Sequence, residues 1–239
     1  MQYQKRINNP KLCIALDMEQ KDKNLSLCSK LKENNIKNIY VKIGLRSFIR
    51  DGVALINEIK KMEFKIFLDL KLYDIPNTML DSINEITKIG VDIITIHSSS
   101  GRSCMEKITN YTKKNPASPL VFAVTALTSF SDNEFSEIYK EKINIAALKF
   151  SKIASECGID GVVCSVLESK TIKKEINILT LTPGIRLNHS LDSNDDQKRI
   201  ASIKDAKECK CDFIVVGRPI YRDKNPVEIT KMILKELES

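Results

Sequence analysis

Tryptophan is absent from the 239-residue chain, histidine occurs only twice, and aromatic residues make up 6% of the sequence. Proteins that hold single-stranded nucleic acid stack its bases on aromatic side chains, and no basic segment here is interleaved with aromatic residues. The net charge of +7 therefore favours anionic partners without requiring nucleic acid. A solvated, lysine-rich surface would account for the same charge.

The sequence also lacks a segment that a membrane would hold. No uninterrupted apolar run approaches the roughly 20 residues that a membrane-spanning helix needs, and the opening MQYQKRINNP has no apolar signal-peptide core. The seven cysteines form no Cys-x-x-Cys pair, and several lie in apolar runs, which is typical of reduced structural thiols. We therefore expect a cytoplasmic protein without membrane contact.

Eight short apolar runs rich in β-branched residues alternate with helical patterns. They cover 12–17, 38–43, 65–71, 91–97, 120–127, 160–165, 177–184 and 212–218. Strand then helix, repeated without a linker, predicts the α/β class and a single-domain (β/α)8 TIM barrel over residues 1–239. An open, doubly wound sheet is the competing fold, but no Gly-x-Gly-x-x-Gly turn follows the first run. Uneven spacing of the runs predicts an extra segment near 129–141 and an abbreviated sixth helix.

Charged residues occupy the last inward-facing positions of the first three apolar runs. Side chains alternate along a strand, so the apolar sets that include Ile14, Val41 and Leu68 are expected to pack under the helices. The opposite sides end in Asp17, Lys42, Asp69 and Lys71. Charges that point into a barrel are costly unless paired, and barrel active sites lie at the carboxyl ends of the strands. Their convergence favours an active site over the alternative, a purely structural ion-pair network.

The segment FLDLKLYDIPNT at 67–78 resembles the signature of the orotidine 5′-monophosphate decarboxylase family, bacterial type. Other segments resemble the family in the family's order: ALD at 15–17, VKIG at 41–44, HSSSGR at 97–102, TALTSF at 125–130, TPGIR at 182–186, DDQKR at 195–199 and VVGRPI at 215–220. The resemblance implies a TIM-barrel carboxy-lyase that converts orotidine 5′-monophosphate to uridine 5′-monophosphate, the last step of pyrimidine (UMP) biosynthesis. It also implies that the reaction uses no cofactor and no metal.

By this resemblance, the catalytic residues are Asp69, Lys71 and Asp74. Lys71 would stabilise the carbanion that develops at pyrimidine C6 and then protonate that carbon, while Asp69 would keep Lys71 charged and oriented. The resemblance further implies a homodimer in which Asp74, Ile75 and Thr78 reach into the neighbouring subunit's site. The residues alone leave another role open for Asp74, as a turn or first-turn helix residue.

The resemblance places the sugar and the base of the substrate as well. Asp17 and Lys42 would contact the ribose hydroxyl groups. Thr128, in the segment after the fifth run, would lie beside the pyrimidine. A helix-capping Thr128 is the alternative that the residues alone allow.

Phosphate binding is expected at the loops after the seventh and eighth strands, where barrels often bind phosphate. These loops contain PGIR and GRPI, so that Arg186, Gly217 and Arg218 are candidate ligands, with Gly184 permitting close backbone approach. The resemblance adds Gln197 and makes the polar loop 187–196 a candidate lid.

Two other functions fit parts of the pattern. Metal-using barrels of the same superfamily, such as keto-gulonate-phosphate decarboxylases and hexulose-phosphate synthases, also carry Asp-x-Lys-x-x-Asp but bind magnesium through acidic ligands. Here Lys42 stands where a glutamate ligand would be expected. A non-catalytic barrel could bind phosphate-bearing ligands or nucleic acid through its positive charge, but the intact Asp69, Lys71 and Asp74 argue against this function. The two histidines, His97 and His189, are assigned no chemical role.

Overall fold

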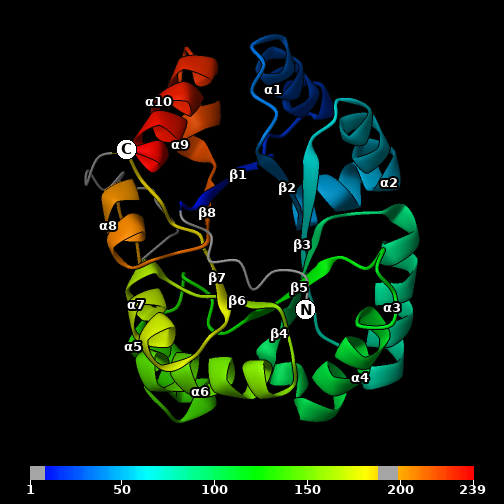
Figure 1. The fold of residues 1–239 in the computed structure, drawn as a ribbon, viewed down its shortest axis with the longest axis vertical. Coiled ribbons are helices and arrows are strands. Elements are labelled where there is room, and N and C mark those ends of the chain that lie inside the picture. Colours follow the sequence, from blue (N-terminus) through cyan, green and yellow to red (C-terminus); the bar gives the residue numbers. More distant parts are fainter. Residues whose placement is uncertain (1–8, 188–198) are drawn as a thin grey trace.

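A closed barrel of eight parallel strands lies inside a ring of helices in the computed structural model, which describes residues 9–187 and 199–239 (Figure 1). The strands follow chain order around the barrel, and β8 pairs with β1 to close it. Their bounds are Lys11–Ala15 (β1), Tyr40–Gly44 (β2), Lys65–Leu72 (β3), Ile93–His97 (β4), Leu120–Val124 (β5), Gly161–Val163 (β6), Leu179–Thr182 (β7) and Phe213–Val216 (β8). Each predicted run overlaps one strand, so the TIM barrel is confirmed and the open sheet is wrong.

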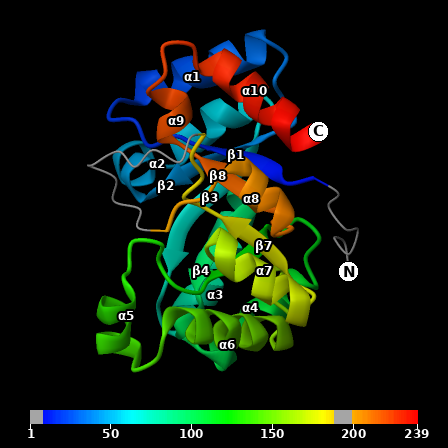
Figure 2. The same cartoon turned by 90° about the vertical axis from the view of Figure 1, so that its left-hand side faces the viewer.

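Helices cover the outside of the barrel, with α1 and α10 at one end of the view in Figure 2 and α6 at the other. Their bounds are Lys21–Glu33 (α1), Leu45–Lys61 (α2), Pro76–Ile89 (α3), Arg102–Thr112 (α4), Asp132–Tyr139 (α5), Ile143–Glu156 (α6), Val166–Glu175 (α7), Ile203–Glu208 (α8), Arg218–Tyr221 (α9) and Pro226–Glu238 (α10), with a 3-10 turn η1 at Ser98–Ser100. The predicted extra segment is α5, and the predicted short helix is α7. Ser131 caps α5 in a capping box with Glu134, so the helix-capping alternative for Thr128 is wrong.

Two apolar layers lie on opposite faces of the barrel wall. Ile14, Val41 and Leu68 are fully buried between the strands and the helices, as strand alternation predicted. The intervening positions fill the barrel interior with a second cluster that includes Cys13, Tyr40, Phe67, Phe122 and Phe213. The Tyr40 and Phe122 rings both pack edge-on against the Phe213 ring. The interior is therefore a packed core.

Gly161 on β6 leaves room for one of these rings. A Cβ atom at this position would lie 2.2 Å from Cε1 of Phe122, far inside van der Waals contact. Gly161→Ala is therefore expected to lower the free energy of unfolding by about 1–3 kcal/mol, because it overpacks the core. Urea unfolding followed by circular dichroism measures the change. Combining it with Phe122→Leu should recover part of the loss, and a double variant no more stable than Gly161→Ala would contradict this explanation.

The cysteines contribute to the packed interior of the protein. All seven cysteines are buried free thiols, and burial raises the pKa of Cys28 to about 12 and that of Cys211 to about 11. These thiols are protonated at neutral pH and serve as small apolar side chains. Among the described residues, every helix is too short or too polar to cross a bilayer.

Candidate active site

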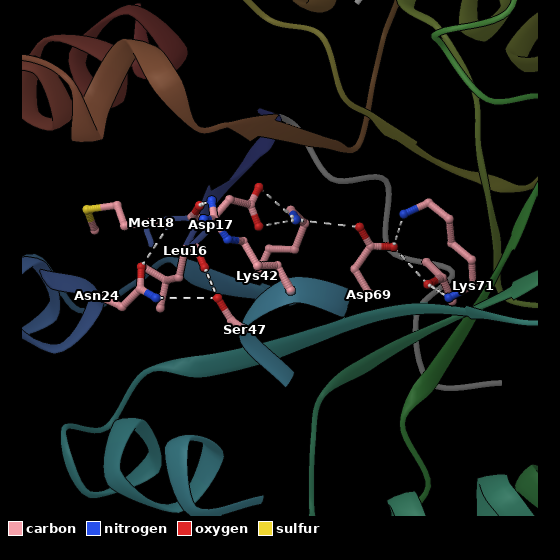
Figure 3. Close-up of polar contacts among 10 residues, drawn as sticks. Leu16, Asp17, Met18, Asn24, Lys42, Ser47, Asp69 and Lys71 are labelled. Atoms are coloured by element: carbon pink, nitrogen blue, oxygen red, sulfur yellow. Dashed lines mark hydrogen bonds and ion pairs between the residues drawn. The ribbon is translucent and has the colours of Figure 1, made fainter. Parts of the chain in front are cut away.

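Four alternating charges form a row across the ends of β1, β2 and β3, here called the charged row: Asp17, Lys42, Asp69 and Lys71 (Figure 3). The Nζ atom of Lys42 lies 3.1 Å from Oδ1 of Asp17 and 3.6 Å from Oδ2 of Asp69. The Nζ atom of Lys71 lies 2.9 Å from Oδ1 of Asp69. The sequence predicted that these four residues meet at one mouth of the barrel, and in the structure they do.

β3 departs from regular strand geometry where it carries the charged row. Its pairing with β4 shifts register between Leu68 and Leu72. Lys71 has a φ of 50°, in the left-handed region that non-glycine residues rarely adopt. The hydroxyl of Thr95 on β4 accepts a hydrogen bond from the Lys71 backbone N–H (3.0 Å) and donates one to Oδ1 of Asp69 (2.9 Å). This irregularity re-aims the Lys71 side chain, as bulges beside active sites commonly do.

Buried polar side chains hold the loop that carries Asp17, which lies two residues beyond the end of β1 and not on the strand as predicted. The Met18 backbone N–H donates to Oδ1 of the buried Asn24 (3.4 Å), and the hydroxyl of the buried Ser47 donates to the Leu16 carbonyl (2.6 Å). These contacts hold the residues immediately before and after Asp17 in the chain (Figure 3). Sequence reasoning missed them; the available signal was a polar residue at a buried position of an amphipathic helix.

Electrostatics keep the centre of the charged row ionised. Burial alone would raise the pKa of Asp69, but the ammonium groups of Lys42 and Lys71 outweigh it, with hydrogen bonds from Lys71 and Thr95, and hold that pKa below its usual value. Burial likewise would lower the pKa of Lys42, but Asp69 and Asp17 outweigh it and raise that pKa. Asp69 and Lys42 are therefore both charged at neutral pH.

The lowered pKa of Asp69 predicts a pH dependence of stability. A carboxyl group whose pKa is lower in the folded than in the unfolded protein stabilises the fold above its unfolded-state pKa, and this contribution is lost as the pH falls through the folded-state pKa. The contribution of Asp69 should thus be complete near neutral pH and disappear as the pH falls below about 4. Chemical denaturation at several pH values should show the stability difference between the wild type and Asp69→Asn shrinking with acidification. A difference that stays constant would contradict the assignment.

His97, at the end of β4, supports the loop that follows β3. Burial and the positive charge of Lys71 both lower the pKa of His97, so its imidazole is neutral at physiological pH. Its Nδ1 accepts a hydrogen bond from the Ser99 backbone N–H (3.2 Å), and its ring packs against Tyr73 with the ring centroids 5.6 Å apart. These contacts agree with the expectation that His97 is structural; His189 lies outside the described residues.

The loop after β3 is exposed to solvent. Asp74, Ile75 and Thr78 are all exposed, and Pro76 begins α3. Oδ1 of Asp74 accepts a hydrogen bond from the Ile75 backbone N–H (2.7 Å), which is the turn role that the sequence left open. Within the described part of the chain, no ion pair joins Asp74 to Lys71.

The loop after β7 carries the first set of predicted phosphate ligands. Gly184 has a φ of 83°, a conformation that favours glycine, and a parallel bridge joins Ile185 to Ala201. In this bridge the Arg186 backbone N–H donates to the Ala201 carbonyl (2.9 Å). Gln197 and the candidate lid from 188 onward lie outside the described residues.

The end of β8 and the loop after β5 carry the remaining candidates. Gly217 follows β8 and Arg218 begins α9. A Cβ atom on Gly217 would lie 3.2 Å from Cβ of Ala15, so glycine allows the end of β8 to pack closely against β1. Thr128 is buried in the loop after β5. These positions lie at the carboxyl ends of their strands, as the charged row does.

No metal-binding cluster of three or more histidine, cysteine, aspartate or glutamate side chains occurs among residues 9–187 and 199–239. The two carboxylates of the charged row, Asp17 and Asp69, already face ammonium groups. Carboxylates that are already paired with ammonium groups fit a magnesium ion poorly, because magnesium binds through free acidic ligands.

A closed (β/α)8 barrel with ionised residues gathered at the carboxyl ends of its strands defines a TIM-barrel enzyme. The profile of the orotidine 5′-phosphate decarboxylase / HUMPS family matches residues 10–233. The chain belongs to this family.

Known relatives cover nearly the whole chain. The chain is 52% identical to an orotidine 5′-phosphate decarboxylase of Campylobacter jejuni (strain 81-176). The alignment spans 230 residues and covers 95% of this chain and 100% of the relative. A crystal structure of orotidine 5′-phosphate decarboxylase from Lactobacillus acidophilus superimposes with a TM-score of 0.82 at 32% identity, covering 97% of this chain and 100% of that one. The enzyme of Methanocaldococcus jannaschii, solved with the inhibitor BMP, superimposes with a TM-score of 0.76 at 25% identity, covering 97% and 100%.

Proposed function

We propose that the protein decarboxylates orotidine 5′-monophosphate to uridine 5′-monophosphate in pyrimidine biosynthesis, as one cytoplasmic domain spanning residues 1–239 and without a cofactor. The observation that carries the proposal is the charged row at the carboxyl ends of β1, β2 and β3. Relatives that share about half of the sequence and carry the name of this activity support the same reaction.

The reaction requires a cation at one carbon atom. Loss of CO2 breaks the bond between C6 and its carboxylate, the electron pair stays on C6, and a proton must then be delivered there. No carbonyl group of the pyrimidine is placed to take up the electrons, so a preorganised charge must stabilise them. A lysine ammonium can do this and also supply the proton.

Exposure selects Lys71 over Lys42 for this role. The Lys71 side chain is 34% exposed, whereas those of Lys42 and Asp69 are 11% and 12% exposed. Lys71 is therefore the cation at the open end of the charged row, where a ligand can reach it. Lys42, enclosed between two carboxylates, is better suited to orient Asp17 and Asp69.

Asp69 has two roles in this proposal. Its hydrogen bond to Lys71 holds the ammonium group in one position. It also presents a negative charge near the carboxylate of the substrate. Two like charges about 4 Å apart at an effective dielectric of about 20 repel by about 4 kcal/mol, and departure of neutral CO2 relieves this repulsion. Relief of that size corresponds to about three powers of ten in rate.

The other candidates supply substrate binding. We assign Asp17, whose side chain is 39% exposed, to the ribose together with Lys42, and Thr128 to the pyrimidine. The phosphate is assigned to Arg186, Gln197, Gly217 and Arg218. Arginine suits this position because its planar guanidinium is permanently charged and can donate two parallel hydrogen bonds to phosphate.

A second copy of the chain is proposed to complete the site as a homodimer. Large apolar side chains are exposed beside the charged row: Tyr73 and Ile75 after β3 are 65% and 66% exposed, and Leu45 and Ile49 at the start of α2 are 51% and 78% exposed. Large apolar side chains that are exposed after two neighbouring strands favour an interface at this end of the barrel. A partner covering it would bring Asp74, Ile75 and Thr78 of each chain toward the other chain's row.

An absorbance assay tests the proposed function directly. Purified protein should remove the ultraviolet absorbance of orotidine 5′-monophosphate, with the same rate after dialysis against EDTA. Turnover that disappears with EDTA and returns with Mg²⁺ would favour the magnesium barrels. Absence of turnover together with salt-sensitive RNA binding would favour the non-catalytic alternative.

A further inference from the structure

Arg199 connects three segments that follow neighbouring strands, at the face of the barrel that carries the charged row. Its Nη1 forms an ion pair with Oε1 of Glu168, at the start of α7. Its Nη2 donates to the Leu127 carbonyl (3.0 Å) and, more weakly, to the Ala126 carbonyl (3.4 Å), both in the loop after β5. Arg199 itself lies in the segment between β7 and α8. One guanidinium therefore connects the loop after β5, the first turn of α7 after β6, and the segment after β7.

The carboxylate partner of Arg199 is itself fixed. Oε2 of Glu168 accepts a hydrogen bond from the Ser165 backbone N–H (2.8 Å) in a capping box at the start of α7. The Glu168 side chain is 8% exposed and that of Arg199 is 18% exposed. Because the pair is buried and Glu168 is held by the helix, the guanidinium has little freedom of orientation.

The groups that Arg199 holds adjoin two of the predicted substrate ligands. Leu127 immediately precedes Thr128, the candidate beside the pyrimidine. Ala201, two residues after Arg199, donates its N–H to the Gly184 carbonyl (3.1 Å) and accepts from the N–H of Arg186, a phosphate candidate. A displacement of Arg199 would therefore change the spacing between the base-binding and phosphate-binding sides of the site.

We propose that Arg199 is a positioning residue that sets the distance between the Thr128 loop and the Arg186 loop, without touching substrate itself. This inference rests on the proposed function. Misplacing binding groups by about 1 Å can cost a hundredfold in rate, so loss of Arg199 should lower kcat/KM for orotidine 5′-monophosphate by about 10- to 100-fold. Most of the change should appear in KM, because Arg199 makes no contact with the charged row.

The chain contains a matched control for a purely structural ion pair. Lys173, near the end of α7, pairs with Asp212, which precedes β8, and the two side chains are 20% and 7% exposed. Like Arg199, Lys173 also donates to a backbone carbonyl, that of Ile178 (2.9 Å). Asp212 lies at the amino end of its strand, so this pair is at the face of the barrel opposite the charged row.

The test compares Arg199→Met with Lys173→Met, using kcat, KM and melting temperature for each. Both variants should lose thermal stability, since each leaves a buried carboxylate unpaired. Only Arg199→Met should raise KM, by about tenfold or more, at a temperature where both variants are folded. Arg199→Lys should recover part of the KM change, because its single ammonium group can keep the charge near Glu168.

The outcomes separate the inference from the function on which it rests. If Arg199→Met and Lys173→Met have the same KM in an otherwise active protein, the inference is wrong. If Arg199→Met does not fold, Glu168→Gln, which keeps an oxygen for Ser165 and removes the charge, should raise KM in the same way, and an unchanged KM overturns the inference. A wild-type protein without turnover would overturn the proposed function, and the inference with it.

Discussion

Lys71→Ala is expected to reduce kcat for orotidine 5′-monophosphate by about four to six powers of ten. The substitution removes both the cation that stabilises charge at C6 and the proton donor, and these contributions are each worth about two to three powers of ten. The exposed end of the charged row would then present only Asp69 to the substrate. Single-turnover assays with excess enzyme measure rates of this size without interference from trace wild-type protein.

A second lysine on the same strand provides the control. Lys65 stands at the amino end of β3, exposed, with its Nζ 5.3 Å from the centre of the Tyr40 ring. Lys65→Ala should leave kcat unchanged within a factor of about two, because it lies at the other face of the barrel. A Lys71→Ala protein that is folded by circular dichroism and turns over at a rate near wild type would rule out Lys71 as the proton donor.

Mixing two inactive variants is expected to restore activity. In the proposed homodimer each site combines Lys71 of one chain with Asp74 of the other, so Lys71→Ala and Asp74→Ala homodimers should both be nearly inactive. A mixed dimer contains one site with both residues intact. Random exchange of subunits should therefore raise the activity to about a quarter of wild type, since half of the dimers are mixed and one site in each is complete.

Two controls define this experiment. Mixing Lys71→Ala with Asp69→Ala should restore nothing, because both residues belong to the same chain's row and every site then lacks one of them. Activity should also appear only after conditions that allow subunits to exchange. Failure of the Lys71→Ala and Asp74→Ala pair to recover activity, in dimers shown to have exchanged, would overturn the shared site.

The barrel was predictable because its signals are local and repeated. Apolar alternation in runs such as 12–17 and 65–71 predicts strands, and the same alternation assigns Ile14 to the helix-facing layer and Cys13 to the interior. The ends of strands were less predictable: the first run was expected to reach Asp17, but β1 ends at Ala15. Strand ends depend on pairing with neighbours, which the local pattern does not contain.

The charged row was predictable as a set of residues but not in its geometry. Alternation placed Asp69 and Lys71 on one side of a regular strand, whereas the register shift and the left-handed backbone at Lys71 are what orient this side chain. Thr95, which bridges the two, comes from a different strand and carries no motif of its own. Arg199 lies within the quoted DDQKR segment, yet its partners are more than 30 positions away. Such contacts exist only after the chain has folded.

The order of charges in the charged row also determines which solutes bind there. It contains two ammonium and two carboxylate groups in alternation, so its formal charges cancel. A simple ion is only weakly attracted to the charged row. A divalent cation that approaches a carboxylate is repelled by the neighbouring ammonium group, and inorganic phosphate that approaches an ammonium group is repelled by the neighbouring carboxylate. Only a molecule whose own polar groups are spread over several ångströms can pair with the alternating negative and positive charges of the row. Discrimination against the common electrolytes of the cell is thus inherent in the order of the four side chains.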